Sequence, residues 1–315
     1  LLQIITGPRQ VGKTTAALQV AEKWPGPVIN ASADQPVPPG PEWIRAHWER
    51  AVSSPEKNVL LILDEIQKVS GWSEEVKSLW DRHTAADGNM RVILLGSSAL
   101  LIERGVTESL SGRFMLHPCR HWSFPEMKQA FGLSLDEWIF YGGYPGSVSF
   151  IGSTAWSRYV RDSLIETVIA KDVLQLRSVA KPALLRHLFM LAASHPAQIL
   201  SYNKMLGQLQ DAGNVTTLSH YLTLLGSAFL ISGLELFKKG RKVKRGSSPK
   251  LIIWNNALIN ALLPDSFANA RGDTEWWGRL IENAVGLYLM NELSIGPYRV
   301  YYWREKGLEV DFIVE

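Results

Sequence analysis

The residues with the clearest chemical potential form a glycine-rich segment close to the start of the chain. Residues 7–14 fit the pattern G-x-x-x-x-G-K-[ST], which cradles phosphate groups when a strand precedes it and a helix follows. The segment and the threonine after it consist of Gly7, Pro8, Arg9, Gln10, Val11, Gly12, Lys13, Thr14 and Thr15. An apolar run precedes the segment and a helical pattern follows it. We therefore predict a phosphate-binding loop rather than a glycine turn beside an incidental Lys-Thr pair.

Each residue type in this loop has a physical role in binding a nucleoside triphosphate. Gly7 and Gly12 permit a curled backbone whose N–H groups face the phosphates, and the following helix adds the positive end of its dipole. Lys13 is expected to reach the β- and γ-phosphates, and the Thr14 hydroxyl to bind Mg²⁺. The expected cofactors are ATP and Mg²⁺.

A second chemical signal is the acidic pair Asp64 and Glu65, which directly follows the apolar strand predicted at residues 59–63. Open parallel sheets bind ligands at the carboxyl ends of their strands. Asp64 is expected to hold Mg²⁺ through water, and Glu65 to orient and deprotonate the attacking water. A strand that ends in acidic residues is weak evidence alone. After a phosphate loop, with one strand between them, the pair indicates ATP hydrolysis.

Three more residues are candidates for contact with the γ-phosphate. Ser97 and Ser98 end an apolar strand and are either a polar sensor of the phosphate or the cap of a helix at residues 99–104. Arg113 stands at the entrance of the fifth predicted strand. It could face the phosphate of its own chain or of a neighbouring subunit in a homo-oligomer. The alternative is an ordinary surface arginine.

The elements that must position these residues alternate between short β-rich runs and amphipathic stretches, the pattern of a parallel sheet covered by helices. The expected strands are residues 2–6, 28–31, 59–63, 91–96 and 113–117. The expected helices are residues 13–23, 42–52, 73–84 and 99–104. Residues 34–41 contain four prolines and are expected to form a loop.

Four segments of the chain together resemble one known family. They are residues 7–15, Leu-Asp-Glu-Ile-Gln-Lys-Val-Ser-Gly-Trp at 63–72, Gly-Ser-Ser at 96–98 and Ser-Leu-Ser-Gly-Arg at 109–113. Over nearly its whole length the chain resembles the prokaryotic AAA-type predicted ATPases, whose C-terminal domain of unknown function is similar in part to PD-(D/E)xK nucleases. Residues 121–126 and Leu95 depart mildly from the family's usual pattern. The resemblance implies a P-loop core of the additional-strand, catalytic-Glu class with strand order 5-1-4-3-2.

The predicted fold is α/β with several domains, because 315 residues exceed the usual length of a single core. A five-stranded parallel P-loop NTPase sheet of AAA-like type is followed by a helical connector, a winged helix and a partial restriction-endonuclease-like α/β domain. The expected limits are 1–130 for the ATPase domain, 131–180 for the connector or lid, 181–258 for the winged helix and 259–315 for the truncated nuclease-like domain.

The winged-helix prediction comes from three helical patterns followed by two strands. The helices are expected at residues 184–193, 202–209 and 217–228, and the strands at 230–237 and 250–254. The loop between the strands is basic and contains no acid, which suits contact with phosphates. Its cationic residues are Lys238, Lys239, Arg241, Lys242, Lys244, Arg245 and Lys250.

Two interpretations of this basic loop stay open. The outward residues of the third helix include no side chain suited to reading base edges. These residues are Thr216, Ser219, His220 and Thr223. A solvated hairpin on a protein-binding winged helix is therefore favoured, and non-specific DNA binding through residues 238–250 is the alternative.

Two acidic residues near the end of the chain are candidates for a second metal site. Glu282 lies on the helix expected at residues 275–293, and Asp311 on the strand at 309–314, an arrangement that resembles the opening of a PD-(D/E)xK core. The E-x-K strand that should follow is absent from the sequence. Nuclease activity is therefore not expected of the chain as given.

Composition limits the class of protein. Hydrophobic residues make up 46% and charged residues 20%, values of an ordinary folded protein with a net charge of +3. Cys119 is the only cysteine, which favours a reducing, cytoplasmic compartment. No apolar run is long enough to span a bilayer. The chain starts without methionine and ends in an apolar strand, so we expect both ends to be cut.

These observations lead to one main hypothesis and two alternatives. The main hypothesis is an ATPase whose nucleotide state moves the winged-helix and nuclease-like domains. The first alternative is an ATP-regulated, DNA-associated effector whose nuclease is completed beyond residue 315. The second is a phosphotransferase acting on a small molecule, which Glu65 beside Asp64 disfavours because this pair suits water as the acceptor.

Overall fold

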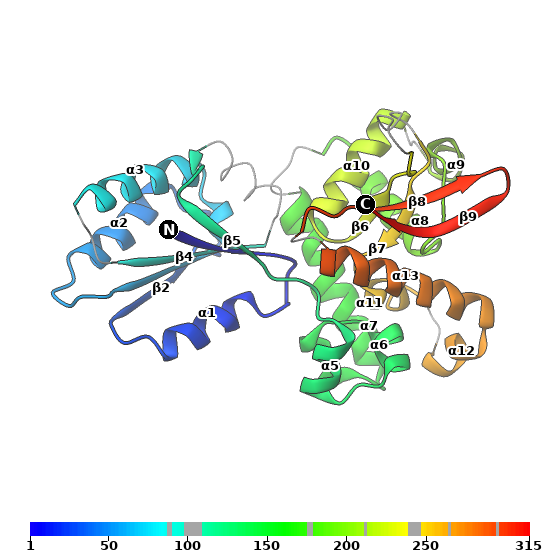
Figure 1. The fold of residues 1–315 in the computed structure, drawn as a ribbon, viewed down its shortest axis with the longest axis horizontal. Helices are drawn as coiled ribbons and strands as arrows, with labels where there is room; N and C mark the ends of the chain where they lie inside the picture. The colour runs from blue at the N-terminus through cyan, green and yellow to red at the C-terminus, as the bar shows by residue number, and fades with distance from the viewer. Residues whose placement is uncertain are drawn as a thin grey trace. The chain divides into compact units, whose positions relative to one another are not determined.

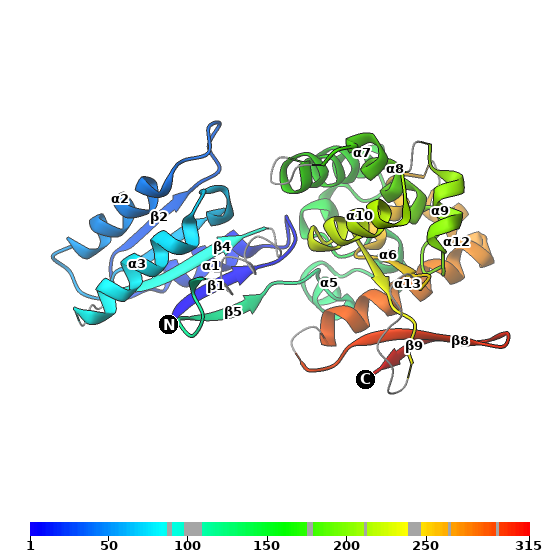
Figure 2. The ribbon, with the colours of Figure 1, turned by 90° about the horizontal axis from the view of Figure 1, so that it is seen from above.

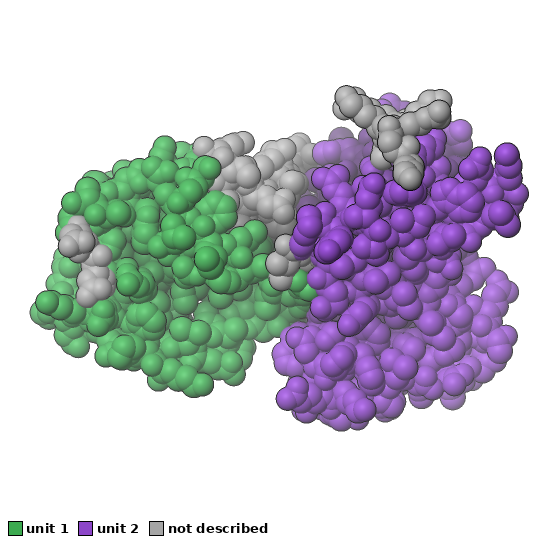
Figure 3. Space-filling view, viewed as in Figure 1, with its two compact units in different colours: residues 1–120 green, residues 121–315 purple. Residues whose placement is uncertain are grey.

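The computed structural model describes most of the chain. The described residues are 1–86, 90–97, 109–174, 179–210, 213–238, 247–263, 266–293 and 296–315. Their contacts divide the chain into two compact units, Leu1–Arg120 and His121–Glu315 (Figure 3). The finer division into four domains stays a prediction.

The first unit is built on a five-stranded sheet in which all neighbouring strands run parallel. The strands are β1 (Leu2–Thr6), β2 (Val28–Ser32), β3 (Leu60–Asp64), β4 (Arg91–Gly96) and β5 (Phe114–Pro118). They lie in the order β2-β3-β4-β1-β5, which is the predicted order 5-1-4-3-2 read from the opposite edge (Figure 1). The strand order and the parallel α/β class are therefore confirmed.

Helices cover both faces of this sheet, so β3 and β4 are apolar almost throughout. The helices are α1 (Lys13–Glu22) on one face, and α2 (Pro41–Val52) and α3 (Trp72–Ala85) on the other (Figures 1 and 2). Successive residues of β3 point to opposite layers. Leu61 belongs to the core under α2 and α3, whereas Leu60 packs with Ala17 of α1. The helix predicted at residues 99–104 lies outside the described residues.

The second unit consists of helices and two antiparallel strand pairs. Its first half contains α5 (Phe124–Phe131), α6 (Leu135–Tyr141), α7 (Thr154–Arg158), the 3₁₀ helix Pro145–Phe150 and the π-helical segments Tyr159–Ile165 and Val168–Leu174. Its second half contains α8 (Pro182–Ala193), α9 (Tyr202–Gln208), α10 (Val215–Ser227), β6 (Ile231–Leu234), β7 (Lys250–Ile253), α11 (Asn256–Asn260), α12 (Phe267–Gly272), α13 (Thr274–Leu293), β8 (Val300–Glu305) and β9 (Leu308–Val314). In the described parts of the chain, no helix combines the length and apolar character needed to cross a membrane.

Local sequence explains where several of these elements begin. Ser123 with Glu126, and Ser134 with Glu137, form capping boxes that start α5 and α6. The order α8, α9, α10, β6 and β7 is the order of elements predicted for residues 181–258, and β6 pairs antiparallel with β7. The assignment of these elements to a winged helix stays a prediction.

Buried asparagines connect distant elements of the second unit. The Asn256 amide donates to the carbonyl oxygens of Ile139 in α6, at 2.7 Å, and Leu280 in α13, at 2.9 Å. Asn283 of α13 bonds both the N–H and the carbonyl of Ile253 in β7, each at 2.9 Å. Buried backbone groups need such partners. The amides therefore join α6, β7, α11 and α13, which the sequence assigns to three different domains.

Replacing Asn256 with alanine is expected to lower the free energy of unfolding by about 2 kcal/mol or more, because two buried carbonyl groups would lose their donor. Urea denaturation followed by tryptophan fluorescence measures this change. The matched control is Asn203→Ala, at an exposed asparagine of α9, and a shift below about 0.5 kcal/mol is expected there. Equal losses in the two variants would contradict the role of Asn256.

Candidate functional site

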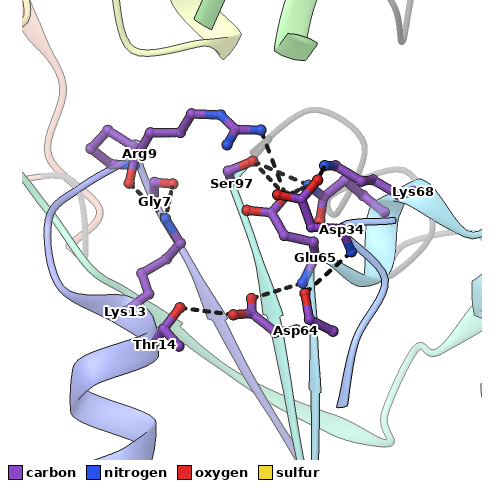
Figure 4. A network of polar contacts seen from close by, with 12 residues as sticks. Gly7, Arg9, Lys13, Thr14, Asp34, Asp64, Glu65, Lys68 and Ser97 are labelled. Carbon is purple, nitrogen blue, oxygen red and sulfur yellow. Dashed lines mark hydrogen bonds and ion pairs between the residues drawn. The ribbon is translucent and has the colours of Figure 1, made fainter. Parts of the chain in front are cut away.

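The chain between β1 and α1 curls tightly, and two glycines make this path possible (Figure 4). Gly12 has a φ of 96°, a left-handed conformation that favours glycine, directly before α1. A Cβ atom at Gly7 would lie 1.8 Å from the carbonyl oxygen of Cys119. No larger residue fits at position 7 on this backbone, and the loop is held against the residue that follows β5.

Lys13 folds back over the loop. Lys13 is only 8% exposed. Its ammonium donates to the carbonyl oxygens of Gly7, at 2.9 Å, and Pro8, at 2.6 Å (Figure 4). Burial lowers the pKa of Lys13, although the nearby carboxylates of Glu65 and Asp64 oppose this effect. Carbonyl oxygens offset the positive charge of a buried ammonium less than an anion would. The group is thus poised to bind an anion.

Thr14 and Asp64 bring the start of α1 to the end of β3. The Thr14 hydroxyl donates to Oδ2 of Asp64 at 2.8 Å, and the Glu65 N–H donates to Oδ1 of the same carboxylate at 2.8 Å. A hydroxyl and a carboxylate side by side are the oxygen ligands that Mg²⁺ prefers in nucleotide sites. The residues present therefore fit the ion that the sequence predicts.

Glu65 adopts an unusual backbone conformation next to this pair. Its φ of 53° and ψ of 38° lie in the left-handed region, which is uncommon for residues other than glycine and concentrates at functional sites. Its Oε2 accepts hydrogen bonds from the Gln67 amide, at 2.5 Å, and the Ser97 hydroxyl, at 3.1 Å. A guanidinium nitrogen of Arg9 lies 3.8 Å from the same oxygen (Figure 4).

Gln67 is the residue of this network that sequence reasoning missed. It lies in a short 3₁₀ turn, Ile66–Lys68, directly after the acidic pair, and is 7% exposed. The available signal was a glutamine two positions after Glu65. Its burial and its contact depend on the left-handed conformation of Glu65, which the sequence pattern does not specify.

Ser97 lies in the site, and residue 98 lies outside the described residues. Ser97 is 2% exposed and bonds Glu65, as a polar partner at the end of β4 should. The alternative role as a helix cap depends on residues 98–104, which are not described.

The other predicted loop residues contribute mainly through the backbone or through packing. Val11 is 2% exposed, so its side chain is buried beneath the loop. Gln10 and Thr15 are exposed, and Gln10 has a left-handed φ of 58°.

Arg113 lies away from the residues of the phosphate site. Its guanidinium forms a two-pronged ion pair with Asp81 of α3, with nitrogen to oxygen distances of 2.6 and 3.0 Å. Its carbonyl accepts from the N–H of Leu2, so it lies at the amino end of the parallel strands. The phosphate loop lies at their carboxyl end. Arg113 therefore does not reach the site of its own chain, and a role in a neighbouring subunit stays a prediction.

Comparison with known families agrees with this geometry. Residues 2–128 match the model of an AAA domain. The matched residues 2–128 include every residue of the phosphate site described above. Residues 132–268 match the model of a domain of unknown function (DUF8612). This second match lies within the unit His121–Glu315.

Uncharacterized proteins of three microorganisms are similar to this chain. One from Mycobacterium tuberculosis is 26% identical over 99% of this chain and 67% of its own length. Others from Haemophilus influenzae and Methanocaldococcus jannaschii are each 24% identical, over 84% and 81% of this chain and 64% and 58% of their own lengths. The chain thus spans about two thirds, or less, of the length of these relatives.

Solved structures with a related arrangement are more distant. The RuvB Holliday junction branch migration motor of Thermotoga maritima aligns with a TM-score of 0.39 and 14% identity, over 78% of this chain and 84% of that chain. The Aeropyrum pernix ORC1 protein, solved in complex with DNA, aligns with a TM-score of 0.35 and 12% identity, over 86% and 88%. Both TM-scores are low, so the assignment of the AAA domain depends on the family match and the sheet order.

Outside the AAA domain, Glu282 and Asp311 lie together, but around a lysine. The side chain of Lys250 is fully buried, and its ammonium bonds Oδ1 of Asp311 at 2.6 Å and contacts Glu282. Glu309 lies 3.6 Å from the same nitrogen. Within the described residues no group of three or more His, Cys, Asp or Glu side chains could hold a metal ion. Lys250 and these carboxylates form an ion-pair cluster, and the metal site at Glu282 and Asp311 stays a prediction.

The electrostatics of this cluster follow from burial and hydrogen bonding. Desolvation acts to lower the pKa of Lys250, but hydrogen bonds with Asp311 and Glu282 outweigh it and raise the pKa overall. Desolvation raises the pKa of Glu282. For Asp311 desolvation also acts upward, but hydrogen bonds with Lys250 and Glu282 bring its pKa below the ordinary value. Lys250 is therefore cationic at neutral pH.

This geometry corrects one part of the basic-loop prediction. Lys250 was expected among the residues that contact phosphates, but it is 0% exposed and its charge is satisfied by carboxylates of the same chain. The first lysine of the loop, Lys238, is exposed. Lys239, Arg241, Lys242, Lys244 and Arg245 lie outside the described residues.

Lys250→Met is expected to lower the free energy of unfolding by about 1 to 3 kcal/mol near pH 7, less than for a fully buried pair because Glu282 and Asp311 are partly exposed. Without the ammonium, mutual repulsion and burial would raise the folded-state pKa of both carboxylates above their unfolded values. Groups with a raised folded-state pKa stabilise the fold at lower pH, and this contribution is lost as pH rises through that pKa.

The variant should therefore regain stability between about pH 7 and pH 5, and by more than the parent protein does. Chemical denaturation at the two pH values measures the difference, with Lys204→Met at an exposed lysine of α9 as the control. Parallel pH profiles for Lys250→Met and the parent would mean that Lys250 does not neutralise these carboxylates.

Proposed function

We propose that the unit Leu1–Arg120 binds ATP with Mg²⁺ and hydrolyses it. The observation that carries this proposal is the meeting of an anion-ready lysine, a hydroxyl and two carboxylates at the carboxyl end of one parallel sheet. These residues are Lys13, Thr14, Asp64 and Glu65. The match of residues 2–128 to an AAA domain supports a nucleotide as the ligand.

The binding step follows from the loop. Phosphate oxygens would replace the carbonyl oxygens of Gly7 and Pro8 as acceptors for the Lys13 ammonium, and would offer it the negative charge that it lacks. Thr14 and Asp64 would hold Mg²⁺. The ion supplies charge neutralisation on the β- and γ-phosphate oxygens.

The chemical step needs a base for water, and Glu65 is the candidate. Its carboxylate would accept one proton of the water as the water oxygen forms a bond to the γ-phosphorus. The bond between that phosphorus and the β–γ bridging oxygen breaks, and its electron pair stays with ADP. A phosphotransferase would need a site for a second substrate, and no described residue of the network favours one.

We further propose that the nucleotide state is passed to the unit His121–Glu315 through the chain after β5. The carbonyl of Cys119 lies against Gly7, and the N–H of Cys119 donates to Thr6 at 2.7 Å. A change in the phosphate loop would therefore act on the backbone at Cys119, two residues before the second unit begins. The DNA-associated effector stays the alternative prediction, because most of its basic residues lie outside the described residues.

Lys13→Ala is expected to weaken ATP binding at least tenfold, which corresponds to about 1.4 kcal/mol, because the ammonium offsets phosphate charge in a site otherwise made of backbone dipoles. Isothermal titration calorimetry with Mg²⁺ and ATP measures the dissociation constant. Lys23→Ala, at an exposed lysine just after α1, is the matched control. Equal affinity of Lys13→Ala and the parent protein would contradict the proposed site.

Glu65→Gln is expected to lower the turnover number for ATP by about 100-fold or more while ATP affinity stays within a few-fold, because an amide fits the site but cannot accept a proton. Phosphate release and calorimetry measure the two quantities. Glu22→Gln, at an exposed position of α1, is the control. Unchanged turnover in Glu65→Gln would exclude this carboxylate as the base.

A further inference from the structure

The carboxylate of Glu65 is held through one of its two oxygens. The Gln67 amide, the Ser97 hydroxyl and the Arg9 guanidinium all approach Oε2, at 2.5, 3.1 and 3.8 Å. Among the described residues, every side-chain group in contact with this carboxylate meets Oε2 and none meets Oε1. One oxygen is fixed, and the other is left for a ligand.

Gln67 and Ser97 form a closed triangle with Glu65. The Gln67 amide nitrogen donates to Oε2 of Glu65 and, at 3.1 Å, to the hydroxyl of Ser97, which in turn donates to Oε2. A carboxylate can only accept hydrogen bonds, so the orientation of the amide is determined: its nitrogen faces Glu65. The triangle therefore fixes the rotation of the carboxylate as well as its position.

The carbonyl oxygen of the Gln67 amide argues against a purely structural role for this residue. Gln67 Oε1 is buried, and no described residue donates a hydrogen bond to it. A buried acceptor without a partner costs about 1 to 3 kcal/mol. A glutamine that served stability alone would have both ends of its amide satisfied. Here the end that contacts Glu65 is satisfied, and the other end has no partner among the described residues.

We propose that Gln67 is a positioning residue for the ATP hydrolysis proposed above, because it holds Oε2 of Glu65 and so presents Oε1 to the attacking water. An amide suits this task since it donates a hydrogen bond without adding a positive charge that would weaken the base. Ser97 supports the amide, and Arg9, at the longer distance, contributes charge from the phosphate loop (Figure 4). This inference rests on the proposed function.

The first test is Gln67→Leu, which keeps the side chain's approximate size and removes both donors. Turnover of ATP is expected to fall about 10- to 100-fold, the range that misplacement of a catalytic group produces. The KM and the calorimetric affinity for ATP should stay within about twofold. Gln208→Leu, at an exposed glutamine of α9, is the control and should leave both unchanged. Thermal melting curves establish that each variant folds.

The second test combines Gln67→Leu with Glu65→Gln. In the Glu65→Gln background the carboxylate is gone, so Gln67→Leu should change ATP turnover by less than about twofold. A residue with only a structural role would lower turnover by the same factor in both backgrounds. Gln67→Met, whose side chain is close in size and has no N–H donor, replaces Gln67→Leu if that variant fails to fold.

The outcomes separate this inference from the function on which it rests. A parent protein no more active than Lys13→Ala would contradict ATP hydrolysis itself. With an active parent, the positioning role fails if Gln67→Leu turns over ATP as fast as the parent or faster, or if it changes KM alone. It also fails if Gln67→Leu lowers turnover by the same factor in the Glu65→Gln background as in the parent.

Discussion

Thr6 pairs with Gly96 on one side and with Pro118 on the other, because β1 lies between β4 and β5 in a parallel sheet. This register makes three loops leave the sheet at the same level: the phosphate loop after β1, Ser97 after β4 and Cys119 after β5. Ser32 pairs with Asp64 in the same way across β2 and β3. The polar network in Figure 4 exists because parallel pairing aligns the carboxyl ends of these strands.

Lys13 and Lys250 are both buried, but different groups surround their ammonium ions. The surrounding groups decide whether each lysine can bind an anionic ligand. Lys13 has carbonyl oxygens as its hydrogen-bond acceptors, and its pKa is lowered by burial. Lys250 has carboxylates as acceptors, and its pKa is raised. The first can gain an anionic ligand, whereas the second already has its counter-ions. Sequence motifs separate the two only partly: Lys13 lies in a recognisable pattern, but the partners of Lys250 lie far away in the chain.

The sequence predicted the five strands and helices α1, α2 and α3 of the first unit to within one residue at each end, because apolar period, glycine and proline are local signals. It did not predict the short 3₁₀ turn Ile66–Lys68. It also located Lys13, Thr14, Asp64 and Glu65, since motif and strand end are local too. Contacts between distant segments were out of reach. The pairing of Arg113 with Asp81 joins residues 32 positions apart, and that of Lys250 with Asp311 joins residues 61 positions apart. Neither pair has a spacing rule that a single sequence could reveal.

Buried polar contacts join several elements of the second unit, as the proposed transmission would require. Asn256 and Asn283 join α6, β7, α11 and α13, and Lys250 adds an ionic connection from β7 to α13 and β9. Such buried contacts resist local rearrangement, because each separation would leave a polar group or a charge without its partner. Under the proposed function, a shift that reaches His121 through Cys119 would therefore move these joined elements together instead of dissipating in the first helices after the sheet.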